Sequence, residues 1–270
     1  MQKRRTSLDT LKLNMLEKIK YVVVFFQIRG QFLKYLSALF QYQKNHNKIK
    51  FPKTIVTLYG LNFKTRQNSK DIAILSYLYE PSTTKLISGA RGKVFIDIGA
   101  HIGRYSLLAA SKGFNVLSFE PNKSNFGSLL ENISLNKFNK KIKVFKVGLS
   151  DKSAKGTLYI NPSQEEKISL LENKDKNTQK ENVFLDKLDN IFIKQDIKAK
   201  DIGVIKIDTE GTELDVLKGA INVLSKGAAI LVIEIQRFKL KAQIDSFLKK
   251  FGYKREDVLD GRNYVFKKKE

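Results

Sequence analysis

The feature that most constrains the fold is a pair of short apolar segments, Val94–Ile98 and Asn115–Phe119, separated by a turn and the span of a helix. Glu120 follows the second segment directly. This order predicts a strand, a helix and a parallel neighbouring strand. An acidic residue at the tip of the second strand, about twenty positions after the turn, is placed to bind two ribose hydroxyls, as in dinucleotide-binding sites. The stretch therefore predicts an α/β sheet that binds a nucleoside-containing ligand.

The glycines of the first turn narrow the choice of ligand. Gly99 and Gly103 form a G-x-x-x-G spacing and not the G-x-G-x-x-G of a dinucleotide site. Glycine lets the backbone pass close to a ligand, and the helix that follows presents free N–H groups. A loop of this form suits a nucleoside with an amino-acid tail better than a pyrophosphate, so we expect S-adenosylmethionine and not NAD. A chance α/β turn with two glycines is the structural alternative.

The composition excludes several kinds of site. The 270-residue chain contains no cysteine and only two histidines, His46 and His101. Disulfides, a thiolate nucleophile and a histidine-rich metal site are therefore excluded, and an intracellular setting is consistent with the composition. The length and a hydrophobic content of 42% fit one catalytic domain with an extension, or two small domains.

Positive charge is concentrated in the first third of the chain. The formal net charge is +23, and residues 1–91 contain 17 Lys and Arg against 4 Asp and Glu, while the remainder contains 33 against 23. Such an excess indicates a polyanionic neighbour, such as a membrane surface, a phosphorylated substrate or nucleic acid. A lysine-rich proteome would explain the same composition without any partner.

Residues 1–50 carry apolar side chains every three to four positions with Lys and Arg between them, which predicts a basic amphipathic helical extension. The densest apolar run, Tyr21–Ile28, is far shorter than the roughly twenty residues that span a bilayer. No small-residue cleavage site follows, so a signal peptide is not expected. We expect the extension to pack on the catalytic domain or on a second copy of the chain. An anionic membrane surface is the second interpretation and nucleic acid the third.

Residues 51–91 are predicted to form a small β/α adaptor that covers one edge of the catalytic sheet. Thr54–Tyr59 and Leu61–Thr65 flank Gly60 and predict a hairpin. A helix is expected from about Asp71 to Tyr79, stopped before Pro81.

Residues 92–270 alternate between strand and helix patterns and predict the catalytic domain. Strands are expected at 94–98, 115–119, 142–149, 204–208 and 228–235, with a small extra strand at 157–160 and a closing hairpin of 255–259 and 264–268; helices are expected at about 103–112, 124–136 and 239–251, with another ending near 224. The polar stretch 161–180 is predicted to be a loop or lid. The fold class is thus a Rossmann-like doubly wound sheet of the class I methyltransferase type, with seven strands and the last one antiparallel.

Six ordered motifs between residues 92 and 236 resemble the FkbM-type S-adenosylmethionine-dependent methyltransferases. They are Phe95–Gly103 with Tyr105–Leu107, Phe119–Asn122, Gly148–Asp151, Leu185-Asp186, Ile205–Glu213 with Val216–Ala220, and Ile233-Glu234. The chain departs from the family pattern at Thr209, where an apolar residue is usual, and at Arg104, where an aromatic residue or Asn is usual. Arg104 could alter the substrate side. The first 91 residues lie outside the resemblance.

The resemblance implies an O-methyltransferase that acts on a hydroxyl of a glycan, a glycolipid or a related metabolite. An RNA methyltransferase is the alternative that the charge favours, although no Asn-Pro-Pro-Tyr type motif follows the fourth strand. A non-catalytic cofactor-binding scaffold at a membrane is a third class. The expected location is cytoplasmic, with the inner membrane face as a site of peripheral association, and a homo-oligomer is left open.

Ligands of open α/β sheets bind beyond the carboxyl ends of the strands, where this chain places several acidic residues. Asp97 is expected to attract the ammonium of the methionine part directly or through water, Glu120 to bind the ribose, and Asp151 to accept from the adenine. His101 is either a structural residue of the loop or a proton acceptor. The expected cofactor contacts are Asp97, Gly99, His101, Gly103, Glu120, Leu149 and Asp151.

The catalytic candidates are Asp208, Glu210 and Glu234, which follow the fourth and fifth strands. Asp208 is expected to orient or deprotonate the acceptor hydroxyl, because a second carboxylate nearby would raise its pKa. Glu213 is interpreted mainly as a charge at a helix N-terminus. No metal is expected, although a divalent ion held by Asp208 and Glu234 is a weighed alternative.

Overall fold

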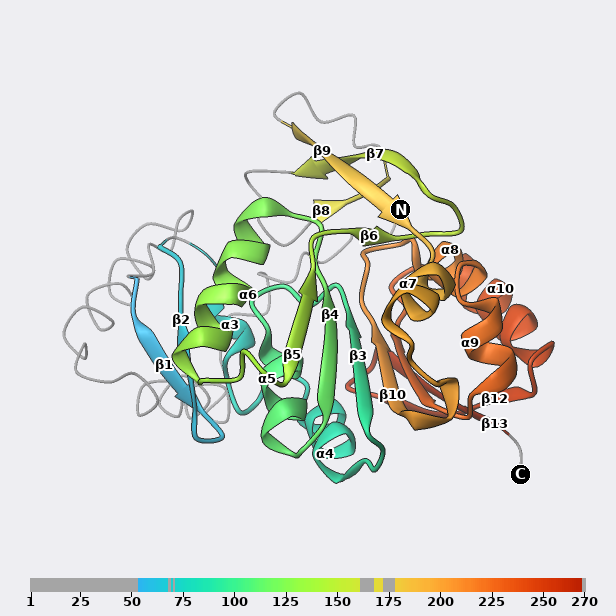
Figure 1. Cartoon of the computed structure of the whole chain (residues 1–270), viewed down its shortest axis with the longest axis horizontal. Helices are drawn as coiled ribbons and strands as arrows, with labels where there is room; N and C mark the ends of the chain where they lie inside the picture. Colours follow the sequence, from blue (N-terminus) through green and yellow to red (C-terminus); the bar gives the residue numbers. More distant parts are fainter. Residues whose placement is uncertain (1–52, 68, 70, 161–167, 172–177, 269–270) are drawn as a thin grey trace, which may run out of the picture. The chain divides into compact units, whose positions relative to one another are not determined.

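The computed structural model describes residues 53–67, 69, 71–160, 168–171 and 178–268. The chain forms two compact units, Met1–Tyr79 and Glu80–Glu270 (Figure 1). The helical extension expected at 1–50 lies outside the described residues, as does much of the loop expected at 161–180. No helix in the described part of the chain is both long and apolar enough to cross a membrane.

The first unit contains the predicted hairpin. Strands β1 (Ile55–Leu58) and β2 (Leu61–Lys64) pair antiparallel, with Leu58 opposite Leu61. Tyr59 and Gly60 both have positive φ, 52° and 78°, as a two-residue hairpin turn requires. Helix α3 (Asp71–Ile74) begins where it was expected but is shorter than the predicted 71–79.

The second unit is built on a seven-stranded sheet, and this confirms the predicted fold class. All neighbouring strands are parallel except β13, which is antiparallel to both of its neighbours (Figure 1). The strand order is β12 (Tyr253–Leu259), β13 (Asn263–Lys268), β11 (Ile230–Glu234), β10 (Ile202–Ile207), β3 (Val94–Ile98), β4 (Asn115–Phe119) and β5 (Ile142–Phe145).

The helices of this unit alternate with the strands along the chain, as in a doubly wound sheet. They are α4 (Pro81–Gly89), α5 (Arg104–Ser111), α6 (Lys123–Leu135), α7 (Leu188–Gln195), α8 (Glu213–Lys218), α9 (Ile221–Lys226) and α10 (Phe238–Lys249), with a 3₁₀ turn at Ala199–Asp201. The helix expected to end near residue 224 is in fact two short helices, α8 and α9.

Helix α4 corrects the prediction that Pro81 ends a helix, because Pro81 instead begins one. Proline is favoured in the first helical turn, where its missing N–H has no partner to lose. The free N–H groups of Ser82 and Thr83 are capped from far along the chain, since both donate to the Asp260 carboxylate at 3.1 and 2.9 Å.

The third predicted strand, 142–149, is also corrected. The main sheet keeps only β5, while β6 (Gly148–Leu149) joins a separate four-stranded sheet in the order β6-β9-β7-β8. The other members of this small sheet are β7 (Ala154–Ile160), β8 (Ile168–Ser169) and β9 (Gln179–Asp186). Figure 1 shows it above the main sheet, where β7 and β9 form its long antiparallel pair.

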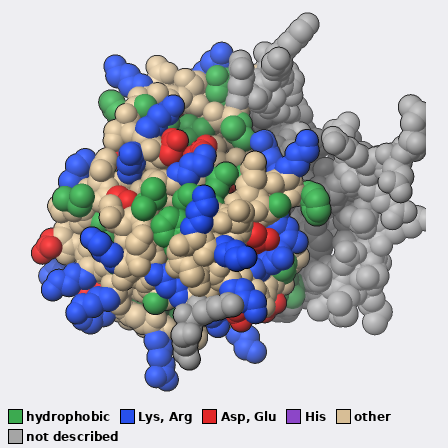
Figure 2. Space-filling model, turned by 90° about the vertical axis from the view of Figure 1, so that its right-hand side faces the viewer, with side chains coloured by type: hydrophobic (Ala, Val, Ile, Leu, Met, Phe, Trp, Pro, Cys, Tyr) green, Lys and Arg blue, Asp and Glu red, His purple; other side chains and the backbone are tan. Residues whose placement is uncertain are grey.

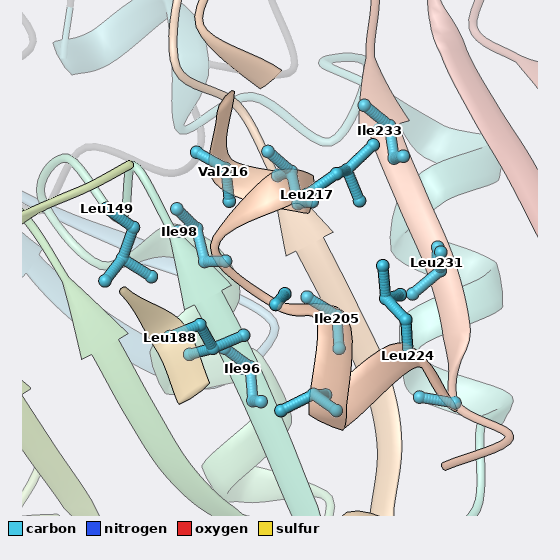
Figure 3. Packing of buried hydrophobic residues seen from close by; sticks show 14 of the residues in the cluster. Ile96, Ile98, Leu149, Leu188, Ile205, Val216, Leu217, Leu224, Leu231 and Ile233 are labelled. Carbon is cyan, nitrogen blue, oxygen red and sulfur yellow. The ribbon is translucent and has the colours of Figure 1, made fainter. Parts of the chain in front are cut away.

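One face of the main sheet is apolar and packs against α7–α10 (Figure 3). Ile96 and Ile98 of β3 share this face because side chains alternate along a strand. Ile205 of β10 continues the same layer, and Leu217 and Leu224 approach it from the helices. Each fully buried side chain of this size contributes roughly 1.5–3 kcal/mol.

The opposite face of the same strands carries a buried polar row. Ser118 of β4, Asp97 of β3 and Lys206 of β10 lie opposite one another in register, and each is at most 2% exposed. Ser106 of α5 covers the row and donates to Asp97 at 2.5 Å. Buried charges must be paired inside the protein. Lys206 therefore pairs with Asp208 at the tip of β10, where the candidate site begins.

Candidate active site

The loop between β3 and α5 is fixed against the tip of β10. Gly99 has φ 81°, and a β-carbon there would lie 1.8 Å from the carbonyl oxygen of Asp208. Gly103 has φ 91°, and a β-carbon would meet Leu129 at 2.5 Å and Leu107 at 2.8 Å. Both predicted glycines are therefore required by backbone conformation and by close packing.

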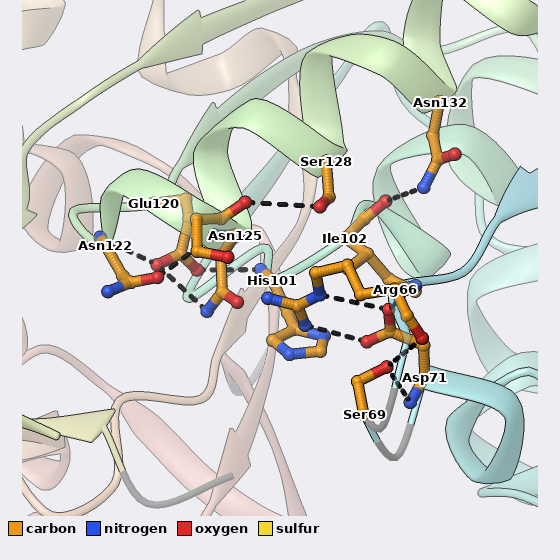
Figure 4. A network of polar contacts seen from close by, with 11 residues as sticks. Arg66, Ser69, Asp71, His101, Ile102, Glu120, Asn122, Asn125, Ser128 and Asn132 are labelled. Carbon is orange, nitrogen blue, oxygen red and sulfur yellow. Dashed lines mark hydrogen bonds and ion pairs between the residues drawn. The ribbon is translucent and has the colours of Figure 1, made fainter. Parts of the chain in front are cut away.

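Glu120 lies at the end of β4 and is held by the neighbouring loop (Figure 4). Its carboxylate accepts from the backbone N–H of His101 at 2.8 Å, from that of Asn122 at 3.0 Å and from the Asn125 amide at 3.4 Å. Glu120 is 4% exposed. The structure thus brings His101 and Glu120 together, and His101 adopts a left-handed conformation with φ 52° that directs its N–H to the carboxylate.

Asp97 lies in the buried row of the sheet. Burial raises its pKa to about 6, and the Ser106 hydrogen bond and the Lys206 charge oppose that rise. Asp97 is only 2% exposed. Its carboxylate accepts a hydrogen bond from Ser106, which lies on the helix that follows the glycine loop.

Leu149 is the last residue of β6, and Asp151 lies two positions after it. Leu149 is 2% exposed and belongs to the apolar core, while Asp151 is partly exposed and accepts from Ser150 at 3.2 Å. The backbone here also packs tightly, since a β-carbon at Gly219 would lie 2.0 Å from the Ser150 carbonyl oxygen.

Two carboxyl groups meet at the tips of β10 and β11. Asp208 and Glu234 hydrogen-bond to one another, and Lys206 donates to Asp208 at 3.0 Å. Gln236 donates to Glu234 at 2.9 Å, and the Arg262 guanidinium lies 3.3 Å from the same carboxyl. The sequence predicted this meeting of Asp208 with Glu234.

The protonation of the pair differs from the prediction, which assigned the raised pKa to Asp208. Burial acts to raise the pKa of Asp208, but the Lys206 ammonium outweighs burial and holds it below the ordinary value. Burial and the charge of Asp208 raise the pKa of Glu234 well above the ordinary value. Of the two, Asp208 therefore carries the charge and Glu234 the proton.

Glu210 is the third predicted catalytic residue and is partly exposed in the loop after β10. Burial, Asp208 and Glu213 together raise its pKa to about 7, while a hydrogen bond with Gln236 opposes the rise. Gln236 thus contacts both Glu210 and Glu234. Glu213 accepts from Gly211 N–H at 2.8 Å and from the Thr209 hydroxyl at 3.1 Å, so it fixes this loop at the start of α8.

Four residues of the site were missed by sequence reasoning. Lys206 is 1% exposed, with its ammonium 5.1 Å from the Tyr105 ring centre. The Tyr105 hydroxyl donates to Glu80 at 2.5 Å, and Arg262 lies 3.5 Å from Glu80. A lysine inside an apolar strand was a usable signal because a buried charge needs a partner, whereas nothing local marks Glu80 or Arg262.

Two cations, Lys206 and Arg262, offset part of the charge of four carboxyl groups, those of Glu80, Asp208, Glu210 and Glu234. Within the described ranges, no cluster of three or more acidic, histidine or cysteine side chains has a geometry that could hold a metal ion. Lys206 and Arg262 instead occupy the positions beside Asp208 and Glu234. The arrangement can hold one ionised and one protonated carboxyl side by side, with Glu210 titrating near neutral pH.

The seven-stranded sheet with its inserted antiparallel strand, and acidic residues at its strand tips, has the architecture of the class I methyltransferase fold. The chain belongs to the family described as the methyltransferase FkbM domain, whose family model matches residues 97–255. The resemblance expected from the six motifs is therefore confirmed.

Several individual proteins are similar over part of the chain. A hexuronic acid methyltransferase, AglP of Haloferax volcanii, is 28% identical over 142 residues, which cover 53% of this chain and 55% of that protein. The chain thus spans about half the length of the curated relative that it matches. A crystal structure of methyltransferase FkbM from Methylobacillus flagellatus is 21% identical, with a TM-score of 0.46, over 65% of this chain and 43% of that one. M. jannaschii TYW2 in complex with AdoMet is 17% identical, with a TM-score of 0.44, over 83% and 92%.

Proposed function

We propose that this protein is an S-adenosylmethionine-dependent O-methyltransferase that modifies a hydroxyl of a glycan, a glycolipid or a related metabolite. The observation that carries the proposal is the pairing of two carboxylate sites in one sheet. Glu120 is fixed by backbone N–H groups after β4, and Asp208, Glu210 and Glu234 gather after β10 and β11.

The donor side fits the residues present. A carboxylate accepts hydrogen bonds and donates none, so Glu120 suits a ribose diol, and the Gly99–Gly103 loop leads into the N-terminus of α5. In this proposal the hydrogen bond from Ser106 of α5 to Asp97 of β3 fixes the two elements that flank the loop. Leu149 and Asp151 would border the adenine ring. S-adenosylmethionine would supply a methyl group on a positively charged sulfur, open to attack by an oxygen nucleophile.

On the acceptor side, the protein must position a hydroxyl and remove its proton. Glu210 suits the role of base, because a carboxyl with a pKa of about 7 is ionised in about half of the molecules at neutral pH and accepts a proton more readily than an ordinary carboxylate. Glu210 would accept the proton that the acceptor hydroxyl loses when its oxygen takes the methyl group that S-adenosylmethionine supplies. Asp208 stays ionised and orients the acceptor, while protonated Glu234 lowers the repulsion around it. Much of the rate can come from positioning alone.

A sugar acceptor is supported by the similarity to the hexuronic acid methyltransferase, a protein that acts on a sugar acid. An RNA acceptor stays the alternative that the net charge of +23 favours. A methylation assay at increasing salt separates the two, because phosphate-backbone binding weakens steeply with salt and a monosaccharide acceptor does not depend on it. Cytoplasmic location, membrane association through residues 1–50 and self-association also stay predictions.

The test is calorimetric titration of the intact chain with S-adenosylhomocysteine. We expect micromolar binding, about −8 kcal/mol, which Glu120→Ala weakens tenfold or more and Glu256→Ala leaves unchanged. Glu256 is the matched control because it is exposed on β12. Failure of the wild type to bind would remove the donor assignment and favour the scaffold interpretation, whereas equal binding by both variants would remove only the role of Glu120.

A further inference from the structure

The segment that follows β11 contains three side chains of different chemistry, the first of which contacts the carboxyl cluster. Gln236 contacts both Glu234 and Glu210. Arg237 is the N-cap residue of α10, and Phe238 is its first helical residue. Gln236 therefore ties the segment to the catalytic candidates, and Arg237 and Phe238 follow it directly in the chain.

Arg237 packs against the loop that carries Glu210. A β-carbon at Gly211 would lie 3.2 Å from Cζ and 3.3 Å from Nε of Arg237, with Leu171 at 2.9 Å on another side. Gly211, with φ 111°, therefore lets the guanidinium approach the backbone of this loop closely. Arg237 is exposed, and no carboxylate within the described ranges forms an ion pair with it.

Phe238 is 88% exposed, the largest exposure among the large apolar side chains described. Phe238 follows Arg237 directly in the chain, so an exposed aromatic ring and a guanidinium that has no ion pair within the described residues occupy neighbouring positions. Figure 2 looks onto the side of this unit that carries α10, where Lys and Arg side chains are spread widely and acidic ones are fewer. A surface of this kind attracts anions.

We propose that Arg237 and Phe238 form an acceptor subsite for an anionic sugar, in which the guanidinium binds a carboxylate or phosphate and the ring packs against the C–H face of the sugar. The proposal rests on the proposed O-methyltransferase function and names the acceptor class of that site. Arg237 also has an electrostatic role here, because ionised Asp208 would repel an anionic acceptor unless a cation faced it. A guanidinium suits either anion, since its paired N–H groups match both carboxylate and phosphate.

The test measures binding of three probes to the intact protein loaded with S-adenosylhomocysteine. The probes are p-nitrophenyl glucuronide, p-nitrophenyl glucoside, which has an uncharged hydroxymethyl group in place of the carboxylate, and glucose 1-phosphate. We expect the wild type to prefer an anionic probe over the glucoside by about tenfold or more. The stronger of the two anionic probes identifies whether the acceptor is a sugar acid or a sugar phosphate.

Variants then assign the preference to the two residues. Arg237→Gln should remove the preference for the anionic probe and leave glucoside binding within about twofold, whereas Phe238→Ala should weaken all three probes by about three- to tenfold. Lys239→Gln is the control, since it removes one exposed charge from the next position of the helix. A preference that survives Arg237→Gln, or one that Lys239→Gln removes equally, would overturn the proposal.

Two further outcomes are separable. If S-adenosylhomocysteine binds but all three probes bind equally, or neither anionic probe binds up to about 10 mM, the subsite is overturned while the methyltransferase assignment stands. If S-adenosylhomocysteine itself does not bind, the donor assignment falls, and with it the subsite that depends on it.

Discussion

Lys206 is the residue on which the charge balance of the site depends. Burial acts to lower its pKa, but Asp208, Glu80 and Glu234 surround its ammonium and raise the pKa well above the ordinary value. A buried ion pair adds little net stability compared with an apolar pair, yet removing one partner strands the other charge in a low dielectric. The ammonium of Lys206 thus stabilises the buried carboxylates next to it.

We expect Lys206→Met to destabilise the protein by about 3–5 kcal/mol, because Asp208 loses its cation while staying buried. Urea unfolding measures this loss. Lys194→Met is the matched control, since Lys194 also pairs with an aspartate, Asp186, at 3.1 Å but with 63% of its side chain exposed. The control should lose at most about 1 kcal/mol. Equal losses for the two variants would contradict the role of Lys206.

Glu234 should make stability depend on pH. Its pKa is raised in the folded state above the ordinary 4.5, so the folded protein holds a proton that the unfolded chain releases. Between pH 4.5 and neutral pH, stability contributed by this group should therefore fall as pH rises. Glu234→Gln keeps a hydrogen-bonding amide without titrating, and urea unfolding across this range should show a flatter profile than the wild type. An unchanged slope would show that other groups carry the dependence.

Glu210 should make activity depend on pH in the opposite direction. A base must be ionised, so kcat/KM should rise with pH up to a pKa of about 7 and then level off. Glu210→Gln should lower kcat by about 10²–10⁴-fold and abolish the rise of kcat/KM near pH 7. The measurement is the rate of S-adenosylhomocysteine release as a function of pH, in the presence of an acceptor that the enzyme methylates. A rise that persists in the variant would assign the titration to another group.

The carboxylates at the strand tips could be predicted from the sequence, whereas the contact of Arg262 could not. Glu120, Asp208 and Glu234 stand at the ends of apolar runs, which places them at the carboxyl edge of the sheet, and Asp97 lies one residue before the end of β3. Arg262 reaches Glu234 only because an antiparallel strand is inserted beside β11. Without that contact, the sequence could not decide which of two neighbouring carboxyls keeps the proton.

At the scale of elements, the apolar runs of the sequence predicted the central strands of the main sheet. Val94–Ile98 and Asn115–Phe119 match β3 and β4 to the residue. Helix α4 was missed because its N-terminal cap comes from Asp260, which lies far away in the sequence. Of the small sheet, the sequence predicted only the extra strand at 157–160, which lies within β7. The rest was missed because β6 pairs with β9 across the stretch 161–180, a tertiary pairing without a local pattern.

The loop between β3 and α5 depends on space as well as on backbone conformation. Gly99→Ala would place a β-carbon 1.8 Å from the Asp208 carbonyl, so we expect a loss of about 3 kcal/mol or more. Gly113→Ala is the matched control, since Gly113 also has positive φ, 101°, but no atom within 4 Å of the added carbon. It should lose only about 1–2 kcal/mol from backbone strain. Thermal or urea unfolding of both variants measures the difference, and equal losses would refute the packing role of Gly99.

At the scale of the whole molecule, the unit that contains the main sheet begins earlier than predicted. The predicted domain begins at residue 92, whereas the compact unit begins at Glu80. Residues 80–91 supply Glu80, which accepts from Tyr105, and Thr84, which accepts from Arg104 at 3.0 Å. Ile87 of the same segment is fully buried. These contacts belong to the charge network and to the core, so they argue for the earlier boundary.

We expect a fragment of residues 80–270 to unfold cooperatively and to bind S-adenosylhomocysteine as the intact chain does. A fragment of residues 92–270 should be less stable by several kcal/mol, because it loses a buried carboxylate partner of Arg262 and Tyr105 together with the buried Ile87 side chain. Urea unfolding and calorimetry on the two fragments measure both properties. Equal stability of the two fragments would restore the boundary at 92, and an unfolded 80–270 fragment would show that the catalytic unit needs the first 79 residues.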